Sequence, residues 1–431
     1  MTTPRRFESD LPALLADLYL AGTPDYRDDL IQQTARVRQR PAWTFPERWL
    51  PVELVTSRVP TTRVPWRQIG VLALIAILLV AALAVYVGSH QQRLPAPFGI
   101  AANGIIAYVR DGKLVTQKPD GSGLVTILPA STGQQSASFS RDGSKIVYKD
   151  LVGGSVVTNS GTVPLTDIVV ADADGSHART VVKAVVAGNP IWSPDGGWLS
   201  YSGLADHAFV VASDGSQPPI DIGTFGAGAW TPSWSPNSEQ LAVAAGDGVL
   251  WLANRDGTSP RRLTVDDYAE LGEKGWSADW SNDGTRLLFG AAKPDEDYAL
   301  YVVGLDGAKE RLVSACANNG VWSPDGNSFA FMHCGTGLGP SVVVADATGS
   351  RRRTLPGYYG WYMPAWSPDQ MRIAILDDRP GPANEPGPPT IVLLDPNAKA
   401  PAISIPAGAS TLTEDRLPDY TLTWQRLAPP G

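Results

Sequence analysis

Apolar and polar positions alternate in short runs along most of the chain after residue 103. Runs such as 145–148 (Lys-Ile-Val-Tyr), 198–201 (Trp-Leu-Ser-Tyr) and 328–331 (Ser-Phe-Ala-Phe) are rich in β-branched and aromatic residues, which is typical of strands. The 43 glycines and 37 prolines suit tight turns between such strands. The pattern predicts a large all-β domain.

One run departs from this pattern, because residues 69–87 are apolar without a single charge. A helix of about 19 residues, at about 1.5 Å per residue, nearly matches the hydrocarbon core of a bilayer. Trp66, Arg67 and Tyr86 are residue types that anchor at membrane interfaces. We expect residues 68–88 to form one transmembrane helix. The alternative is a buried core helix, which is rarely apolar on all sides at this length.

Charge predicts the orientation of that helix. Residues 1–67 carry ten arginines, no lysine and eight carboxylates, whereas Arg93 is the nearest cation after the run. Because basic residues stay on the cytoplasmic side, we expect the N-terminus inside and the C-terminal part outside. The net charge of −8 leaves about −10 on the outer part, which argues against a nucleic-acid partner.

The segment 1–67 predicts two short helices. The first begins near Ser9 and ends by Gly22; the second starts at Pro24 and runs to about Arg38. A Trp- and Pro-rich stretch follows, with too little mass for a core. We expect a docking segment that orders on a cytoplasmic regulator. The alternative is an amphipathic tail lying on the membrane surface.

A motif of an aromatic residue, Ser, Pro, Asp and Gly recurs with variations along the outer part. Ser-Pro-Asp-Gly suits a type I turn, and the aromatic residue is expected to wedge between neighbouring units. Successive copies start 42 to 58 residues apart, which suits four-stranded propeller blades. The aromatic positions, including a lone copy near the end, are Phe139, Trp192, Trp234, Trp280, Trp322, Trp366 and Trp424.

The two ends of the outer part complement each other. Residues 104–128 supply three strands without the motif strand, and residues 421–427 supply a lone motif strand with Trp424. Joined, they form a composite blade that closes the ring. This predicts seven blades, or six if one unit is degenerate.

These repeats resemble the TolB-like, WD40-like (PD40) β-propeller repeats of bacterial envelope proteins, over about residues 103–427. The resemblance implies a β-propeller in residues 104–427, behind a linker at 89–103. It also implies a bacterial cytoplasmic membrane with the propeller on the outer side. TolB itself resembles a propeller of six blades. The overall layout and the tail loosely resemble membrane-bound anti-sigma factors, without the zinc-binding His/Cys motif of that family.

The two ends of such a ring differ in sequence. One end, the turn face, carries the connections between strands one and two and between strands three and four, which are short and uniform. The other end, the loop face, carries all the variation, including insertions at 150–167, 291–298 and 377–389. Five aromatic residues in its loops are a candidate binding rim; the alternative is that they cap the channel. They are Trp230, Trp276, Tyr358, Trp361 and Tyr362.

Cys316 and Cys334 are the two cysteines, and they flank the turn at 323–327. The hairpin places them almost opposite each other, so we expect a disulfide outside the cytoplasm. The register is off by about one residue, so an adjustment is needed.

Catalytic signatures are missing from the sequence. The four histidines are scattered, and neither a G-x-S-x-G elbow nor a phosphate-binding loop occurs. An acidic run at 295–297 could bind calcium, but such runs are more often solvated turns. We expect no enzyme activity, cofactor or metal.

The sequence therefore favours a module that binds an envelope protein, peptide or glycan and signals through its tail in the manner of an anti-sigma factor. The alternatives are an envelope assembly scaffold and a propeller-based hydrolase or lyase. A channel containing paired carboxylates near the loop face would favour the last of these.

Overall fold

A computed structural model describes residues 73–76 and most of 98–428. The internal segments outside the description are 111–112, 129–135, 159–160, 226–231, 246–248, 264–273, 293–297, 306–310, 315, 335–338, 358–362, 378–389, 400–401 and 407–421. Among the described residues, no helix is both long and apolar enough to cross a membrane. The predicted tail, and the predicted span apart from the helical residues 73–76, lie outside the described residues.

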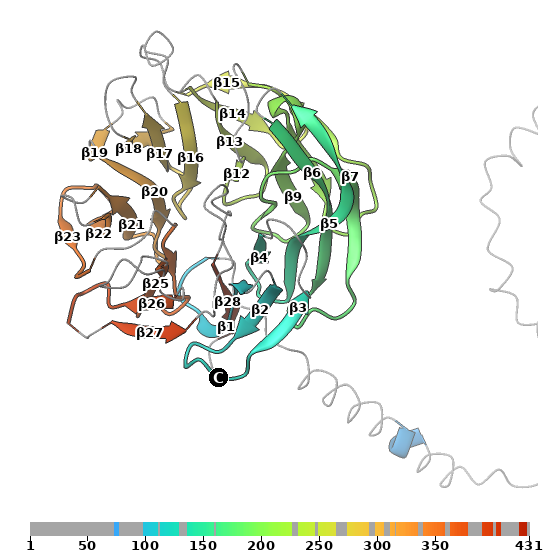
Figure 1. The fold of residues 1–431 in the computed structure, drawn as a ribbon, viewed down its shortest axis with the longest axis horizontal. Helices are drawn as coiled ribbons and strands as arrows, with labels where there is room; N and C mark the ends of the chain where they lie inside the picture. Colours follow the sequence, from blue (N-terminus) through green and yellow to red (C-terminus); the bar gives the residue numbers. More distant parts are fainter. Residues whose placement is uncertain are drawn as a thin grey trace, which may run out of the picture. The chain divides into compact units, whose positions relative to one another are not determined.

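The unit that starts at residue 92 consists of seven four-stranded antiparallel sheets arranged around a central axis (Figure 1). We call these sheets blades A to G, in order around the ring.

The strands of each blade are given from the axis outward. Blade A contains β28 (Thr423–Leu427), β1 (Ala102–Arg110), β2 (Lys113–Gln117) and β3 (Val125–Leu128). Blade B contains β4 (Ala137–Phe139), β5 (Lys145–Thr158), β6 (Gly161–Asp172) and β7 (Arg179–Val185). Blade C contains β8 (Ile191–Trp192), β9 (Trp198–Ser202), β10 (Ala208–Ala212) and β11 (Ile220–Gly223), with the 3-10 helix η3 (Leu204–Asp206) between β9 and β10. Blade D contains β12 (Ser233–Trp234), β13 (Gln240–Ala244), β14 (Leu250–Asn254) and β15 (Arg261–Arg262).

The remaining three blades complete the ring. Blade E contains β16 (Lys274–Trp280), β17 (Arg286–Ala292), β18 (Tyr298–Gly304) and β19 (Arg311–Ser314). Blade F contains β20 (Ala317–Trp322), β21 (Ser328–His333), β22 (Ser341–Asp346) and β23 (Arg352–Thr354). Blade G contains β24 (Ala365–Trp366), β25 (Ile373–Asp377), β26 (Thr390–Leu394) and β27 (Ile403–Pro406).

Blade A joins the two ends of the ring. β28 pairs with β1, so that Leu427 lies opposite Ala102 and Thr423 opposite Ala107. The composite blade and the count of seven are confirmed, and the alternative of six blades is wrong. β1 begins at Ala102, two residues before the predicted boundary.

The core lies between adjacent blades rather than along the axis. Between blades D and E, for example, Leu252, Trp280 and Phe289 belong to one buried cluster. The indole N–H of a motif tryptophan donates to a carbonyl in the first strand of the preceding blade, at 2.9–3.3 Å, in five copies. The predicted wedge between blades is therefore confirmed for Trp192, Trp234, Trp280, Trp322 and Trp366.

The motif serine explains why each turn closes in the same way. Its hydroxyl oxygen is buried and accepts the backbone N–H five residues later, at 2.9–3.1 Å, in all six turns. It also donates to the Asp or Asn two residues on, as Ser323 does to Asp325. The turn at Phe139 closes in this way too, with Arg141 in place of the motif proline.

Candidate functional site

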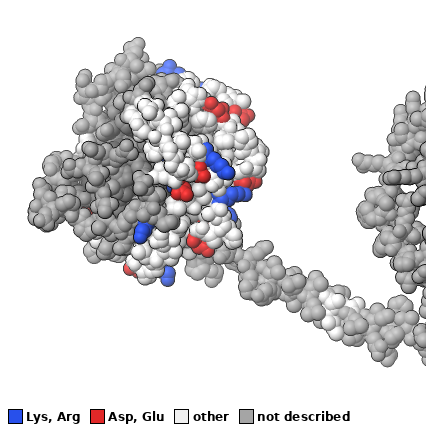
Figure 2. All heavy atoms as spheres, turned by 45° about the vertical axis from the view of Figure 1, so that its right-hand side comes forward, with Lys and Arg blue, Asp and Glu red and all other residues white. Residues whose placement is uncertain are grey.

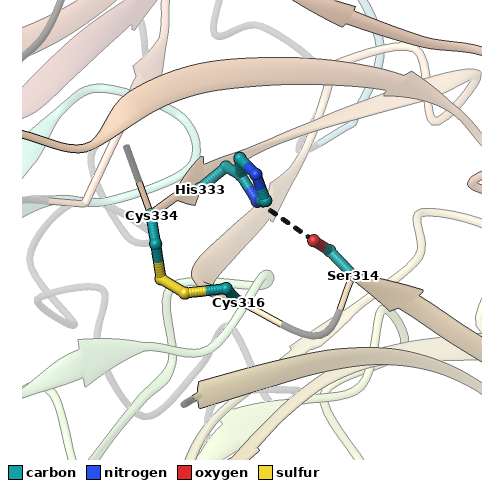
Figure 3. Close-up of a disulfide and its surroundings, with 4 residues drawn as sticks. All are labelled: Ser314, Cys316, His333 and Cys334. Carbon is teal, nitrogen blue, oxygen red and sulfur yellow. Dashed lines mark hydrogen bonds between the residues drawn. A yellow bond between two sulfur atoms is a disulfide. The ribbon is translucent and has the colours of Figure 1, made fainter. Parts of the chain in front are cut away.

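The disulfide marks the loop face of blade F (Figure 3). It joins Cys316 and Cys334, the pair predicted from the sequence, with 5.4 Å between the Cα atoms. His333 Nδ1 lies 3.1 Å from the hydroxyl oxygen of Ser314, at the end of β19 in blade E. The disulfide and this contact together fix the loop-face ends of two neighbouring blades.

A bulge in β20 supplies the register adjustment that the disulfide needs. Trp322 lies opposite Phe329, whereas Ala317 lies opposite His333, so one extra residue of β20 is accommodated between Asn318 and Val321. Asn319 adopts a left-handed conformation there, with φ of 55°. Cys316 and Cys334 then lie directly opposite, and the N–H of Cys334 donates to the carbonyl of Cys316 at 3.0 Å.

Blade C carries an aromatic and ionic group at its loop-face end. His207 Nδ1 lies 2.8 and 2.9 Å from the two carboxylate oxygens of Asp221. The ring of Phe209 stacks on Tyr201 and lies beside that of His207. Burial, and then the charge of Asp221, raises the pKa of Tyr201 to about 12. Tyr201 therefore stays neutral. We interpret these packed side chains as a structural support for the adjoining loop.

The insertion at 150–167 is a β-hairpin that extends β5 and β6. Asp150 and Asp167 are direct cross-strand neighbours near its base. Burial, and then repulsion from Asp167, raises the pKa of Asp150. Asp167 accepts the Ala184 N–H at 2.8 Å and the Thr180 hydroxyl at 3.4 Å. These paired carboxylates lie on the second and third strands of blade B, away from the axis, and Asp167 has a structural role.

The chain segment before β1 crosses the turn face and is held to several blades. Gly99 N–H donates to the carbonyl of Pro324 in blade F, and Ala101 N–H donates to that of Pro368 in blade G, both at 3.0 Å. The carbonyl of Gly99 accepts a 2.7 Å hydrogen bond from Arg426 in blade A. The Phe98 ring lies 5.0 Å beneath the guanidinium of Arg141 in blade B. Residues 98–101, which we call the clasp, thus contact four blades at this end of the ring.

Two charged residues of blades B and E influence each other electrostatically. Arg141 stands in the motif turn of blade B, and Asp279 stands just before Trp280 in blade E. Burial raises the pKa of Asp279 to about 6. The N–H that Trp322 donates at 3.0 Å and the attraction of Arg141 both act to lower this pKa, but burial outweighs them. Burial also lowers the pKa of Arg141. Both pKa shifts are in the direction that loss of hydration produces, since it disfavours the charged form of each group. Each side chain nevertheless keeps some solvent-accessible surface.

These two residues were not among the candidates predicted from the sequence, yet the repeat contains a signal for them. Arg141 replaces the motif proline, and Asp279 occupies a position that is uncharged in every other copy. The predicted rim cannot be placed in the same way. Trp230, Tyr358, Trp361 and Tyr362 lie outside the described residues, and Trp276 belongs to β16 while its side chain is not described.

The described residues form no group of three or more His, Cys, Asp or Glu side chains that could hold a metal ion. The run at 295–297 lies outside them. On the side of the molecule drawn in Figure 2, basic and acidic side chains are interspersed among uncharged ones.

Comparison with known proteins agrees with the architecture. The sequence model of the TolB beta propeller domain (PD40) matches residues 155–373. An uncharacterized protein of Agrobacterium fabrum is 26% identical over 159 residues, which are 33% of this chain and 53% of that protein. The chain thus spans about half the length of this relative.

Solved structures are similar in fold alone. TolB from Acinetobacter baumannii is 16% identical with a TM-score of 0.44, over 79% of this chain and 70% of that one. An oligogalacturonate lyase from Vibrio parahaemolyticus is 13% identical with a TM-score of 0.50, over 70% of this chain and 90% of that one. The PD40 match covers half of the sequence and falls within the ring of motif-bearing blades, so the chain belongs to the TolB beta propeller (PD40) family.

Proposed function

We propose that this chain is a membrane-anchored propeller that binds a protein, peptide or glycan outside the cytoplasm, through its loop face. The observation that carries the proposal is the difference between the two faces. The turn face has uniform turns and is crossed by the clasp, whereas the loop face bears the disulfide and the extended β5–β6 hairpin. Variable loops on a rigid scaffold are the usual place for binding residues.

Two features support a location outside the cytoplasm. The apolar run at 69–87 is long enough to span a bilayer, and the arginines precede it. The disulfide suits an oxidising compartment. Reporter fusions at Arg58 and at Gly431 test the topology. We expect the first to report the cytoplasm and the second the exterior; the reverse would overturn the proposal.

The proposed contact surface is the aromatic rim. The full chain in detergent would be immobilised and exposed to solubilised envelope fractions and to glycan and peptide arrays. Replacing Trp230, Trp276 and Trp361 with Ala should abolish capture and leave the melting temperature unchanged. As a control, Leu124, Val125 and Met371, which are exposed on the turn face, are replaced with Ala. If the rim variant unfolds, the rim aromatics are caps and the binding proposal fails.

We propose a binding role rather than an enzymatic one. The paired carboxylates Asp150 and Asp167 lie on the second and third strands of blade B rather than in the channel, and hydrogen bonds from the Ala184 N–H and the Thr180 hydroxyl engage Asp167. A signalling role is favoured over a scaffold by the clasp, because the residues that lead from the membrane segment are bonded directly to the ring. Deleting residues 1–67 should abolish the response of a cytoplasmic regulator; a scaffold would work without them.

A further inference from the structure

Equivalent grooves lie between neighbouring blades on the turn face. One, between blades B and C, has a volume of about 510 Å³ and contains Lys145, Arg179 and Asp214 among its lining residues. The other, between blades F and G, has a volume of about 460 Å³ and is lined in part by Arg351, Arg352 and Arg353. The repeat gives the two grooves the same backbone frame, so their difference lies in the side chains.

In the groove between blades B and C the charges are balanced. Lys145 forms a 2.6 Å ion pair with Asp172. Arg179 lies close enough to Asp214 to lower the pKa of that carboxyl, after the hydrogen bonds from Ser216. Lys145 therefore has a carboxylate partner, and Arg179 lies near the carboxylate of Asp214 while its hydrogen bond goes to the Ser213 carbonyl.

In the groove between blades F and G the cations have no such partners. Arg353 donates to the Pro396 carbonyl of blade G, whereas Arg352 points the other way and donates to the Val313 carbonyl of blade E. No ion pair joins any of the three arginines to a carboxylate in the described part of the chain. Asp346 accepts the N–H groups of Thr348, Ser350 and Arg351.

The other carboxylate of this groove is engaged as well. Asp369 accepts hydrogen bonds from Asn103 and Ser367. Three exposed arginines therefore form an unneutralised positive strip along the edge of blade F, on a domain that is acidic overall.

This positive strip lies beside the point where the membrane segment is attached. The clasp is bonded to blades F and G, at Pro324 and Pro368. Exposed apolar side chains occur at the same end: Ile100 in the clasp is 63% exposed, and Met371, which lines the groove, is 66% exposed. Because the clasp holds residues 98–101, nine residues (89–97) separate the ring from the predicted span, which limits the tether to about 32 Å.

We propose that this groove and the adjoining edge of blade F dock on anionic lipid headgroups, with Arg351 and Arg353 in the groove and Arg352 beside it as the contacts to phosphate. The proposal rests on the membrane anchor of the proposed function. A guanidinium group suits bidentate binding of phosphate, and exposed apolar side chains can enter the headgroup region. The acidic charge elsewhere is screened beyond about 8 to 10 Å, so the local strip decides the interaction. Docking would tilt blades F and G toward the membrane and turn the loop face outward.

The size of the effect follows from the number of arginines. Each cation near an anionic surface shifts the docking equilibrium by roughly fivefold, so replacing three should shift it by about a hundredfold. The test uses the full chain in nanodiscs, with a donor dye on Met371→Cys and an acceptor on lipid headgroups. Energy transfer is compared between discs of phosphatidylglycerol and discs of phosphatidylcholine.

We expect stronger energy transfer in phosphatidylglycerol discs. Adding 0.5 M salt should reduce this energy transfer, because the ions screen the attraction between the arginines and the headgroups. Changing the three arginines to Gln should make the two lipids equivalent. The matched control, Lys145→Gln with Arg179→Gln, removes two cations from the balanced groove and should leave the difference intact. Equal transfer in both lipids, or loss of the difference in the control, would overturn the docking proposal. If the chain fails to enter nanodiscs at all, the anchor proposal fails instead.

Discussion

At the scale of single residues, the positions that depart from the repeat carry the chemistry inside the ring. Arg141 and Asp279 each stand where the other copies of the repeat have an uncharged residue, in blades B and E, and the charge of each influences the pKa of the other. Phe98 of the clasp lies under Arg141. The interior of the ring at its turn-face end is therefore charged, partly desolvated and covered by the segment that leads from the N-terminal part of the chain.

Asp279 makes the stability of the ring depend on pH. Its pKa is about 6 when folded and 3.8 when unfolded, so the unfolded state ionises first as the pH rises. Stability should therefore fall between about pH 4 and pH 6.5, by at most about 3 kcal/mol, a bound that water near the side chain reduces. Asp279→Asn keeps an acceptor for the Trp322 N–H and should remove this slope in thermal melts.

The carboxylates of the turns provide the internal reference for that experiment. Although burial opposes it, hydrogen bonds from Ser281 and Thr285 hold the pKa of Asp283 at about 2. Its contribution to stability is lost only below about pH 4, in both proteins. If the Asp279→Asn variant keeps an unchanged slope above pH 4, Asp279 is ruled out as the source of that slope.

Gln370 occupies a strained position that glycine would relieve. The fourth turn residue has a positive φ of 70–73° at Gly143, Gly196, Gly284 and Gly326, and Gln370 adopts 63°. Gln370→Gly should raise the free energy of unfolding by up to about 1 kcal/mol, because glycine adopts this conformation without strain. The loss of the Gln370 side-chain hydrogen bond to Asp325 reduces this gain. Chemical denaturation measures the gain. Gly143→Ala should have the opposite effect, because its Cβ would overlap the carbonyl oxygen of Arg426.

At the scale of elements, the contact between blades is a buried aromatic wedge with one hydrogen bond. Trp280 donates to the carbonyl of Ser233 at 3.1 Å. Trp424 occupies the same position in blade A, but its indole nitrogen has no hydrogen-bond partner in the described part of the chain. The two positions therefore separate the packing contribution from the hydrogen-bond contribution.

Replacing each tryptophan with Phe measures that difference. Both substitutions remove similar buried volume, since Trp280 and Trp424 are 5% and 7% exposed. Trp280→Phe also leaves the Ser233 carbonyl without its indole donor, so it should cost about 1 kcal/mol more than Trp424→Phe. Equal losses in urea unfolding would show that the indole hydrogen bond contributes nothing to the wedge.

The elements also show what the sequence could and could not predict. The strands, the seven blades and the disulfide pair follow from local patterns and motif spacing. The disulfide pair also showed that a one-residue adjustment was needed, but its position between Asn318 and Val321 of β20 was not predicted, because either side of the hairpin could have supplied it. The sequence predicted the clasp only as part of a linker. Its contacts with Pro324 and Pro368 join residues more than 200 positions apart, and no local pattern reveals such contacts. The electrostatic influence of Arg141 and Asp279 on each other depends on the arrangement of blades B and E and was not predicted.

At the scale of the whole molecule, one strand completes the ring. Truncating the chain before Leu417 removes β28 and leaves one edge of β1 unpaired. It also removes Arg426, which holds Gly99 of the clasp. The shortened protein should therefore melt at a lower temperature than the full chain. A matched deletion of residues 429–431 removes chain beyond β28 and should not lower the melting temperature.

The pairing of β28 with β1 also sets the order of events during synthesis. Ala102 and Leu427 are partners, so β1, β2 and β3 are synthesised long before β28, the strand that completes their blade. Blades B to G can form as they emerge, but closure requires a loop of more than 300 residues and comes last. An open ring exposes the edge of β1 throughout that interval, which is the state that chaperones and proteases can recognise. Whatever the loop face binds, it is complete only after the final strand has joined the ring.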